Sequence, residues 1–261
     1  MKYGFIGCGN MGGAVAQALS KATKDILLSD VSGKGKQLAQ SLGCSYGTKA
    51  EAAACDRVFL AVKPQVMKEV LAQLQTVLAE KKPLLITMAA GLKLETIADY
   101  AGVALPIIRI MPNTPVAVGK GVLEYCVNDL VTEDILQDFL VDMRHAGMLD
   151  AIEETLIDGA CSVSGCGPAF AYLFIEALTE GAVACGVPRD KALAYAAETL
   201  AGAAEMVKAT GKDPIALKDA VCSPNGSTLE GVKVLEDRNF RGIVKDCVAA
   251  SYRRNQELGK K

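Results

Sequence analysis

Short apolar runs alternate with helical patterns along roughly the first 150 residues of the chain. The runs lie at residues 3–6, 26–29, 57–62, 84–88, 107–111, 122–127 and 148–152. Runs of this length are typical of strands that are buried on both faces of a sheet. Between them, apolar residues recur at helical spacing, as in residues 66–78 and 135–143. The alternation predicts a doubly wound, mostly parallel sheet with helices on both faces.

The pattern changes after Glu153 and Glu154, where strand patterns stop and helical segments follow one another. Residues 169–185 are apolar on nearly every side, so a helix there must be covered all round. A small helical domain offers too little cover of its own, which predicts burial against a partner subunit. We therefore expect an α/β domain over residues 1–152 and an all-α, dimerising domain over residues 153–261.

A glycine-rich turn joins the first apolar run to the first helix, with the sequence Gly7-Cys8-Gly9-Asn10-Met11-Gly12. A G-x-G-x-x-G turn between a strand and a helix is typical of dinucleotide-binding (Rossmann) domains. Gly7 allows the tight turn, Gly9 lets the backbone approach a pyrophosphate, and Gly12 lets helix and strand pack closely. The start of the helix adds free N–H groups for the phosphates.

Asp30 ends the second apolar run. An acidic residue about 20 positions beyond the glycines usually accepts hydrogen bonds from the adenosine ribose, which favours NADH. Ser29, Ser32, Lys34 and Lys36 lie close by and could instead hold the 2′-phosphate of NADPH. The predicted coenzyme is therefore NADH or NADPH, with Asp30 favouring NADH.

Composition and charge exclude several classes of partner. A net charge of -2 offers no basic face for nucleic acid or a membrane surface. The longest uncharged run, residues 159–175, is shorter than a membrane span of about 20 residues. The nine cysteines form no C-x-x-C pair and His145 is the single histidine, so we expect no metal site. Unpaired cysteines are typical of a reducing compartment, and the first predicted strand starts too close to residue 1 to follow a signal peptide. Both observations predict a cytoplasmic protein.

A second candidate binding element lies in the helical half, at Ser223-Pro224-Asn225-Gly226-Ser227-Thr228. A turn of this kind that opens a helix forms an anion-binding nest. Its N–H groups converge, and the helix dipole favours negative charge. The sequence thus predicts a site for an anionic group outside the dinucleotide-binding domain.

Six ordered motifs closely resemble those of the pyrroline-5-carboxylate reductases, and residues 217–236 resemble that family's signature. The motifs lie at residues 5–12, 61–65, 89–91, 109–115, 164–170 and 223–228. The resemblance spans nearly the whole chain. It implies hydride transfer from NAD(P)H to the C=N bond of 1-pyrroline-5-carboxylate, giving L-proline in the last step of proline biosynthesis.

The resemblance also implies an architecture and a set of site residues. The expected fold is a Rossmann domain followed by a helical domain like that of 6-phosphogluconate dehydrogenase, interleaved with its twofold mate to form a homodimer. Some members of the family assemble into decamers. The substrate carboxylate is expected to bind Ser223, Asn225, Gly226, Ser227 and Thr228. The coenzyme is expected to contact Ala61, Val62, Lys63, Pro64, Ala89, Ala90, Gly91 and Glu154, in addition to residues 7–12 and Asp30.

Thr228 is the candidate catalytic residue. An imine accepts hydride more readily when it is protonated, so a hydroxyl or a bound water near its nitrogen would help. The alternative role of Thr228 is that of a helix N-cap. Asn225 stands where the family usually has Gly, but Asn tolerates a left-handed conformation, so the turn can survive. Cys161 stands where the family often has Thr, which removes a good hydrogen-bond donor.

Two other hypotheses compete with the reductase. The first is a related enzyme, either another cyclic-imine reductase or a β-hydroxyacid dehydrogenase. The dehydrogenase normally uses a catalytic lysine in the helical domain, whereas Lys208, Lys212 and Lys218 lie in segments that are predicted to be exposed. The second is a nucleotide-sensing protein without turnover, which would have no use for the anion-binding nest.

Overall fold

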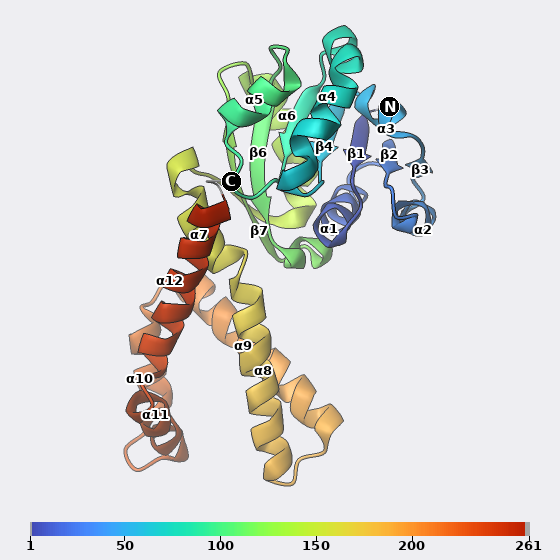
Figure 1. Ribbon diagram of the computed structural model, residues 1–261. Coiled ribbons are helices and arrows are strands. Elements are labelled where there is room, and N and C mark those ends of the chain that lie inside the picture. Colours follow the sequence, from blue (N-terminus) through green and yellow to red (C-terminus); the bar gives the residue numbers. More distant parts are fainter. Residues whose placement is uncertain (1, 259–261) are drawn as a thin grey trace. The chain divides into compact units, whose positions relative to one another are not determined.

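The computed structural model describes residues 2–258, which form two compact units (Figure 1). Residues 2–166 and 251–258 form the first, here called the sheet unit. Residues 167–250 form the second, here called the helical unit. The chain therefore leaves the sheet unit after residue 166 and returns to it at residue 251.

Within the described residues, an eight-stranded sheet lies at the centre of the sheet unit, in the order β3-β2-β1-β4-β5-β6-β7-β8. All neighbouring strands are parallel except β6 and β7. The strands are β1 (Tyr3–Ile6), β2 (Ile26–Ser29), β3 (Ser45–Tyr46), β4 (Arg57–Leu60), β5 (Leu84–Thr87), β6 (Ile107–Pro112), β7 (Gly121–Val127) and β8 (Gly147–Ala151). Because β2 and β4 lie on opposite sides of β1, the carboxyl ends of β1 and β4 form the switch point where such sheets bind ligands.

Helices cover both faces of the sheet, as the pattern predicts. They are α1 (Asn10–Leu19), α2 (Lys34–Leu42), α3 (Lys49–Ala53), α4 (Pro64–Lys81), α5 (Leu94–Ala101), α6 (Glu133–Met143) and α7 (Ile157–Ser164). One apolar cluster contains Phe5 and Phe59, whose ring centroids are 4.3 Å apart, together with residues of α1 and α6. The other contains Val58 and Leu60 with residues of α3, α4 and α5. Since Val58, Phe59 and Leu60 alternate between the two clusters, β4 is buried on both faces.

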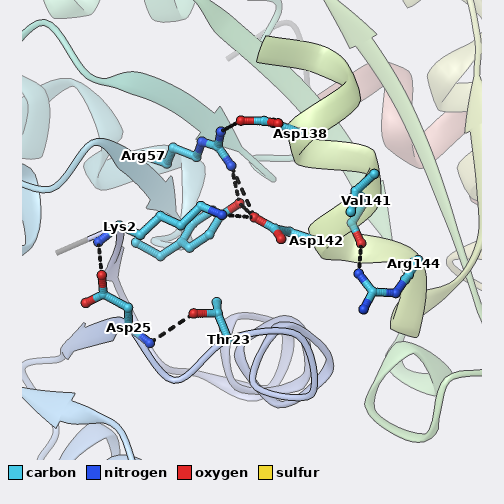
Figure 2. Close-up of polar contacts among 9 residues, drawn as sticks. Lys2, Thr23, Asp25, Arg57, Asp138, Val141, Asp142 and Arg144 are labelled. Carbon is cyan, nitrogen blue, oxygen red and sulfur yellow. Dashed lines mark hydrogen bonds and ion pairs between the residues drawn. The ribbon is translucent and has the colours of Figure 1, made fainter. Parts of the chain in front are cut away.

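A polar network fixes α6 to the amino ends of β1 and β4, at the edge of the sheet opposite the switch point (Figure 2). Asp142 accepts hydrogen bonds from Lys2 Nζ at 2.6 Å and Tyr3 Oη at 2.7 Å. It also pairs with Arg57 Nη1 at 3.2 Å, and Arg57 Nη2 pairs with Asp138 at 2.7 Å. Burial, followed by the bond to Asp142, raises the pKa of Tyr3 far above its ordinary value. The network thus holds a neutral phenol between two ion pairs.

The helical unit contains helices and, among its described residues, no strand. Its helices are α8 (Gly167–Ala184), α9 (Arg189–Thr210), α10 (Pro214–Val221), α11 (Ser227–Asp237) and the first part of α12 (Phe240–Leu258). Within α8, Thr179 is the one buried residue. Tyr172 and Leu173 of the same helix are 60% and 65% exposed. The apolar helix expected to need a cover is thus left largely uncovered by its own chain.

The stretch Glu154–Ala184 is long and apolar enough to cross a membrane, judged by length and composition alone. Its most apolar window has a mean hydropathy of 1.3 and is 11% buried. The stretch is not one continuous helix, because a turn at Gly165 and Cys166 separates α7 from α8. The expectation that no part of the chain enters a membrane stays a prediction.

The structure differs from the sequence-based expectation in a few elements. Strand β3 and helices α3, α5 and α7 were not expected as separate elements, and the helix that the Ser223–Thr228 turn was expected to open is followed by a second helix after a break. These are separated at Arg238 and Asn239, where Asn239 has a positive φ of 54°. The domain boundary expected between residues 152 and 153 follows the change from strands to helices, whereas contacts divide the chain after residues 166 and 250. That boundary stays a prediction.

Candidate active site

The glycine-rich turn follows β1 at the switch point and has the conformation that its three glycines predict. Gly7 has a φ of 100°, and a Cβ there would lie 2.5 Å from the carbonyl oxygen of Ala61. A Cβ on Gly12 would lie 2.5 Å from the carbonyl oxygen of Gly7. Gly9, by contrast, has no atom within 4 Å of its Cβ position, so its backbone is open to a ligand. Helix α1 begins at Asn10 without a side-chain cap, which leaves its first N–H groups available.

Asp30 follows β2 and braces this turn. Its Oδ2 accepts a hydrogen bond from the N–H of Cys8 at 3.0 Å, and its Oδ1 accepts one from the N–H of Ser32 at 2.7 Å. Burial raises the pKa of Asp30, but the hydrogen bonds from Ser32 and Cys8 lower it by more, so the net shift is downward. An ionised carboxylate therefore stands beside the turn at neutral pH.

A hollow of about 580 Å³ opens next to Asp30. Its lining includes Gly7, Asp30, Val31, Tyr46, Thr48 and Val62. Tyr46 donates a hydrogen bond from Oη to the backbone carbonyl of Asp30 at 2.9 Å. The hollow has the position expected for the adenosine half of a dinucleotide. Tyr46 and Thr48 were not predicted as site residues, although Thr48 and Glu51 form a capping box with a recognisable sequence pattern.

The two other segments that are expected to contact the coenzyme follow neighbouring strands. Ala61 to Pro64 connect β4 to α4, with Lys63 as N-cap and Pro64 in the first turn. Ala89, Ala90 and Gly91 follow β5, and Gly91 has a positive φ of 77°. Parallel strands bring their carboxyl ends to one edge of a sheet, so both segments lie on the same edge as the glycine-rich turn.

Glu154 lies beside the segment that follows β5. Its Oε1 accepts a hydrogen bond from the backbone N–H of Leu94 at 2.7 Å. The same oxygen pairs with Nη1 of Arg109 at 2.9 Å. Arg109 lies on β6, and its side chain is 3% exposed. Arg109 was noted in the sequence as part of a motif but was not predicted to be a site residue.

Two cysteines of the sheet unit, Cys8 in the glycine-rich turn and Cys161 in α7, are poor nucleophiles. Burial raises the pKa of Cys8 to about 12 and that of Cys161 to about 11. Both thiols are therefore protonated at neutral pH. No group of His, Cys, Asp and Glu side chains that could hold a metal ion is present in the described part of the chain.

The predicted nest lies in the helical unit, at the start of α11. The N–H of Gly226 donates to the carbonyl of Ser223 at 3.0 Å, and Asn225 between them has a φ of 60°. Pro224 and a left-handed residue at these positions are typical of a type II turn. Asn225 thus takes the left-handed conformation that the sequence analysis required of it.

Thr228 is not the N-cap of α11, so that alternative role is wrong. The N-cap is Gly226, which has no side-chain cap, and Thr228 is the second helical residue. Ser227 and Thr228 are both exposed. The backbone N–H groups of the first residues of a helix have no partner within that helix. Those of Ser227 and Thr228 therefore lie unpaired by α11 at the positive, N-terminal end of its dipole. The turn therefore offers free donors for an anion, with the Thr228 hydroxyl beside them.

Comparison with known proteins identifies the family. A curated pyrroline-5-carboxylate reductase of Escherichia coli (strain K12) is 38% identical to the chain, over 99% of the chain and 98% of that protein. The chain belongs to the pyrroline-5-carboxylate reductase family. A curated pyrroline-5-carboxylate reductase of Synechocystis sp. is likewise 38% identical, over 100% of the chain and 99% of that protein.

The family also accounts for both units of the chain. A crystal structure of Plasmodium falciparum pyrroline carboxylate reductase with NADP bound has a TM-score of 0.90 and 32% identity, covering 99% of this chain and 98% of that one. The family model for pyrroline-5-carboxylate reductase dimerisation matches residues 154–258. The model for coenzyme F420-dependent NADP oxidoreductase matches residues 2–91. The predicted fold, a Rossmann domain with a helical dimerisation domain, is thereby confirmed.

The positions of the lysines agree with membership of the reductase family rather than of the β-hydroxyacid dehydrogenases. The side chain of Lys208 is 67% exposed and pairs with Glu205, and Lys212 is also exposed. Lys218 is 35% exposed and pairs with Asp219. None of the three is enclosed as a catalytic lysine of the helical domain would be. The chain is an NAD(P)H-dependent oxidoreductase of the pyrroline-5-carboxylate reductase family.

Proposed function

We propose that the chain reduces the C=N bond of 1-pyrroline-5-carboxylate to give L-proline, with NADH or NADPH as hydride donor. The observation that carries this proposal is the similarity to pyrroline-5-carboxylate reductases along the whole chain. An open dinucleotide-binding turn in one unit and an anion-binding nest in the other support it, because the reaction needs both.

Residues of the sheet unit are proposed to hold the coenzyme. The backbone of Gly7, Cys8, Gly9, Asn10, Met11 and Gly12 would bind the pyrophosphate, and Asp30 would bind the adenosine ribose. The segments Ala61–Pro64 and Ala89–Gly91, with Glu154 behind the second, would enclose the nicotinamide half. The coenzyme supplies the hydride, while the chain supplies position and exclusion of water.

Residues of the helical unit are proposed to hold the substrate. Free N–H groups at Ser227 and Thr228, and the turn formed by Ser223, Asn225 and Gly226, would bind the carboxylate. The Thr228 hydroxyl, or a water that it orients, would donate a hydrogen bond to the imine nitrogen. Substrate that enters as the iminium brings its own proton, so the chain needs no buried acid of its own.

Coenzyme preference is a separate proposal. Asp30 places a negative charge at the hollow where a 2′-phosphate would bind, which favours NADH. The related Plasmodium falciparum structure has NADP bound, so NADPH is the alternative that a test of Asp30 has to distinguish.

The assembly is proposed to be a homodimer through the helical unit, which could build further into a decamer. The exposed apolar residues of α8 and the dimerisation domain support a second copy of this chain, rather than lipid, as their cover. We further propose that the chain works in the cytoplasm, because its nine cysteines are free, and that it binds neither nucleic acid nor membrane.

A turnover assay tests the reaction. Oxidation of NADH and of NADPH is followed at 340 nm with 1-pyrroline-5-carboxylate as acceptor, and proline is measured as product. No turnover with either coenzyme would refute the proposed reaction. Thr228→Ala should lower kcat/KM for the imine by about 10- to 100-fold while NADH binding stays within about twofold. Thr210→Ala, at the exposed end of α9, is the matched control.

A further inference from the structure

The segment between β5 and α5 is weakly held by its own backbone. The N–H of Met88 donates to Leu60 at 3.3 Å, and the N–H of Leu92 donates to Ala89 at 3.4 Å. The N–H of Ala89 reaches the hydroxyl of Thr87 at 3.4 Å. These distances are at the long end of the hydrogen-bond range. The backbone hydrogen bonds of the segment therefore hold Ala89 to Lys93 only weakly.

Helix α5, which this segment enters, also lacks a local cap. Its N-cap residue is Lys93, whose side chain makes no cap hydrogen bond. The N–H of Leu94, the first helical residue, instead donates to Glu154, 60 positions further along the chain, at 2.7 Å. A carboxylate at this end of a helix is favoured by the dipole as well as by the hydrogen bond. Glu154 is thus the cap of α5.

Arg109 fixes the carboxylate that makes this cap. Its strand, β6, pairs with β5 so that Arg109 lies opposite Thr87, the last residue of β5. Its Nη1 binds Glu154 Oε1 at 2.9 Å, and its Nη2 lies 3.7 Å from Asp158. Because the guanidinium is buried and planar, the oxygen that binds Leu94 has little freedom to move.

We propose that Arg109 and Glu154 are positioning residues, which set the segment Ala89–Lys93 against the nicotinamide half of the coenzyme. They act through a single backbone group, the N–H of Leu94. The inference rests on the proposed function for the placement of the nicotinamide at this segment. Glu154 thus acts on the coenzyme through the position of this segment, and Arg109 acts by fixing Glu154.

Leu94→Pro tests the proposal because it removes that N–H, and its ring Cδ, in the place of the hydrogen, also pushes the Glu154 carboxylate away, so the cap is lost while both charged residues are kept. Proline is favoured in the first turn of a helix. The preceding residue, Lys93, already has φ -81° and ψ 161°, which a following proline requires. Leu94→Ala is the matched control, since it removes the side chain and keeps the N–H. Glu154→Gln removes the charge, and Glu153→Gln, at an exposed neighbouring position, is its control.

The readout is a ratio of two dissociation constants, those of NADH and of ADP-ribose, measured on the full chain by calorimetry. ADP-ribose lacks the nicotinamide and binds through the glycine-rich turn and the hollow beside Asp30. Leu94→Pro should raise the NADH constant by about tenfold and change the ADP-ribose constant by less than about twofold. Glu154→Gln should act in the same direction, and the two control variants should leave the ratio within about twofold.

An unchanged ratio in Leu94→Pro would overturn the proposal. Equal weakening of NADH binding and ADP-ribose binding is one form of this result, and it would show general damage to the dinucleotide site. If the parent chain binds NADH without reducing the imine, the proposed reaction fails while the ratio still decides the role of the Leu94 N–H. The two failures are therefore distinguishable.

Discussion

The network around Asp142 offers the most direct test of what holds the sheet unit together (Figure 2). The perturbation is Asp142→Asn, which removes a carboxylate that is 13% exposed and bonded to Lys2, Tyr3 and Arg57. Removing one partner of a buried ion pair costs about 3–5 kcal/mol. The lower end applies here, because Arg57 keeps Asp138 and Lys2 is 38% exposed to water.

A cost of about 3 kcal/mol corresponds to a decrease of roughly 6–12 °C in melting temperature for a chain of this size. Asp138→Asn is the matched control on the same helix, and Asp138 is 69% exposed. Because Asp138 is solvated and Arg57 keeps Asp142, loss of this pair should cost about 1 kcal/mol at most, and this control should lose no more than roughly 4 °C. Melting is followed by circular dichroism at one protein concentration, because oligomers melt in a concentration-dependent way.

Acid should remove the difference between the parent and Asp142→Asn. Burial raises the pKa of Asp142, but hydrogen bonds from Lys2 and Tyr3 lower it by more, so its pKa lies below the ordinary 3.8. A carboxyl whose pKa is lowered by folding stabilises the protein above its unfolded pKa, and this contribution is lost as the pH falls through the folded pKa. The two melting temperatures should thus converge below about pH 4. Equal decreases for Asp142→Asn and Asp138→Asn at pH 7 would refute the reasoning.

Three further predictions concern the coenzyme site and the assembly. Asp30→Ser should shift the ratio of kcat/KM for NADH and NADPH about tenfold towards NADPH, and an unchanged ratio in initial-rate assays would count against Asp30 as the ribose contact. Gly12→Ala, whose Cβ would lie 2.5 Å from the Gly7 carbonyl, should weaken NADH binding more than tenfold by calorimetry. Gly13→Ala, with its nearest neighbour 3.4 Å away, should bind within about threefold of the parent, and equal losses in both would contradict the packing argument. Sedimentation velocity should show a dimer that persists at micromolar concentration, whereas a monomer at every concentration would contradict the proposed cover of α8.

The central strands were predictable because each is a short run that is buried on both faces. In β1 and β5 every residue is buried, and apolar runs of this kind have few alternatives. The sequence-based ends of three strands were too late by one or two residues, since Ala61 and Val62 after β4, Met88 after β5 and Ile152 after β8 are apolar but lie in connections. Apolar character alone does not mark where the ladder of hydrogen bonds stops.

Most of the elements that were missed lack a hydrophobic pattern of their own, but α5 has one, since Leu94, Ile97, Ala98 and Ala101 recur at helical spacing. Strand β3 has two residues, both exposed, and it exists because β2 lies next to it. Helix α3 has five residues, too few to show a period, although its capping box was visible in the sequence. The break between α11 and α12 depends on a left-handed Asn239, a backbone state that a helical pattern does not reveal.

The site residues also divide into those that local sequence marks and those that distant contacts position. Residues of the glycine-rich turn and the nest could be located from the sequence, because glycine positions and turn chemistry are local properties. The contact of Glu154 with Leu94 and Arg109 could not, since it joins residues that are 60 and 45 positions apart. Tyr46 in the hollow was missed for a similar reason, as its place depends on the pairing of β3 with β2.

The chain returns to the sheet unit only at residue 251, so the sheet unit gains its last residues late in synthesis. Asn255 donates to the carbonyl of Asp158 at 3.2 Å, and Gln256 donates to the Asp158 carboxylate at 3.2 Å. Both belong to the part of α12 that packs with the sheet unit, yet residues 167–250 must be translated before them. A ribosome-bound chain can form the sheet before Asn255 and Gln256 are available to contact α7. Expressing residues 1–166 alone would therefore give an incomplete unit, which residues 251–258 would have to complete as a separate peptide.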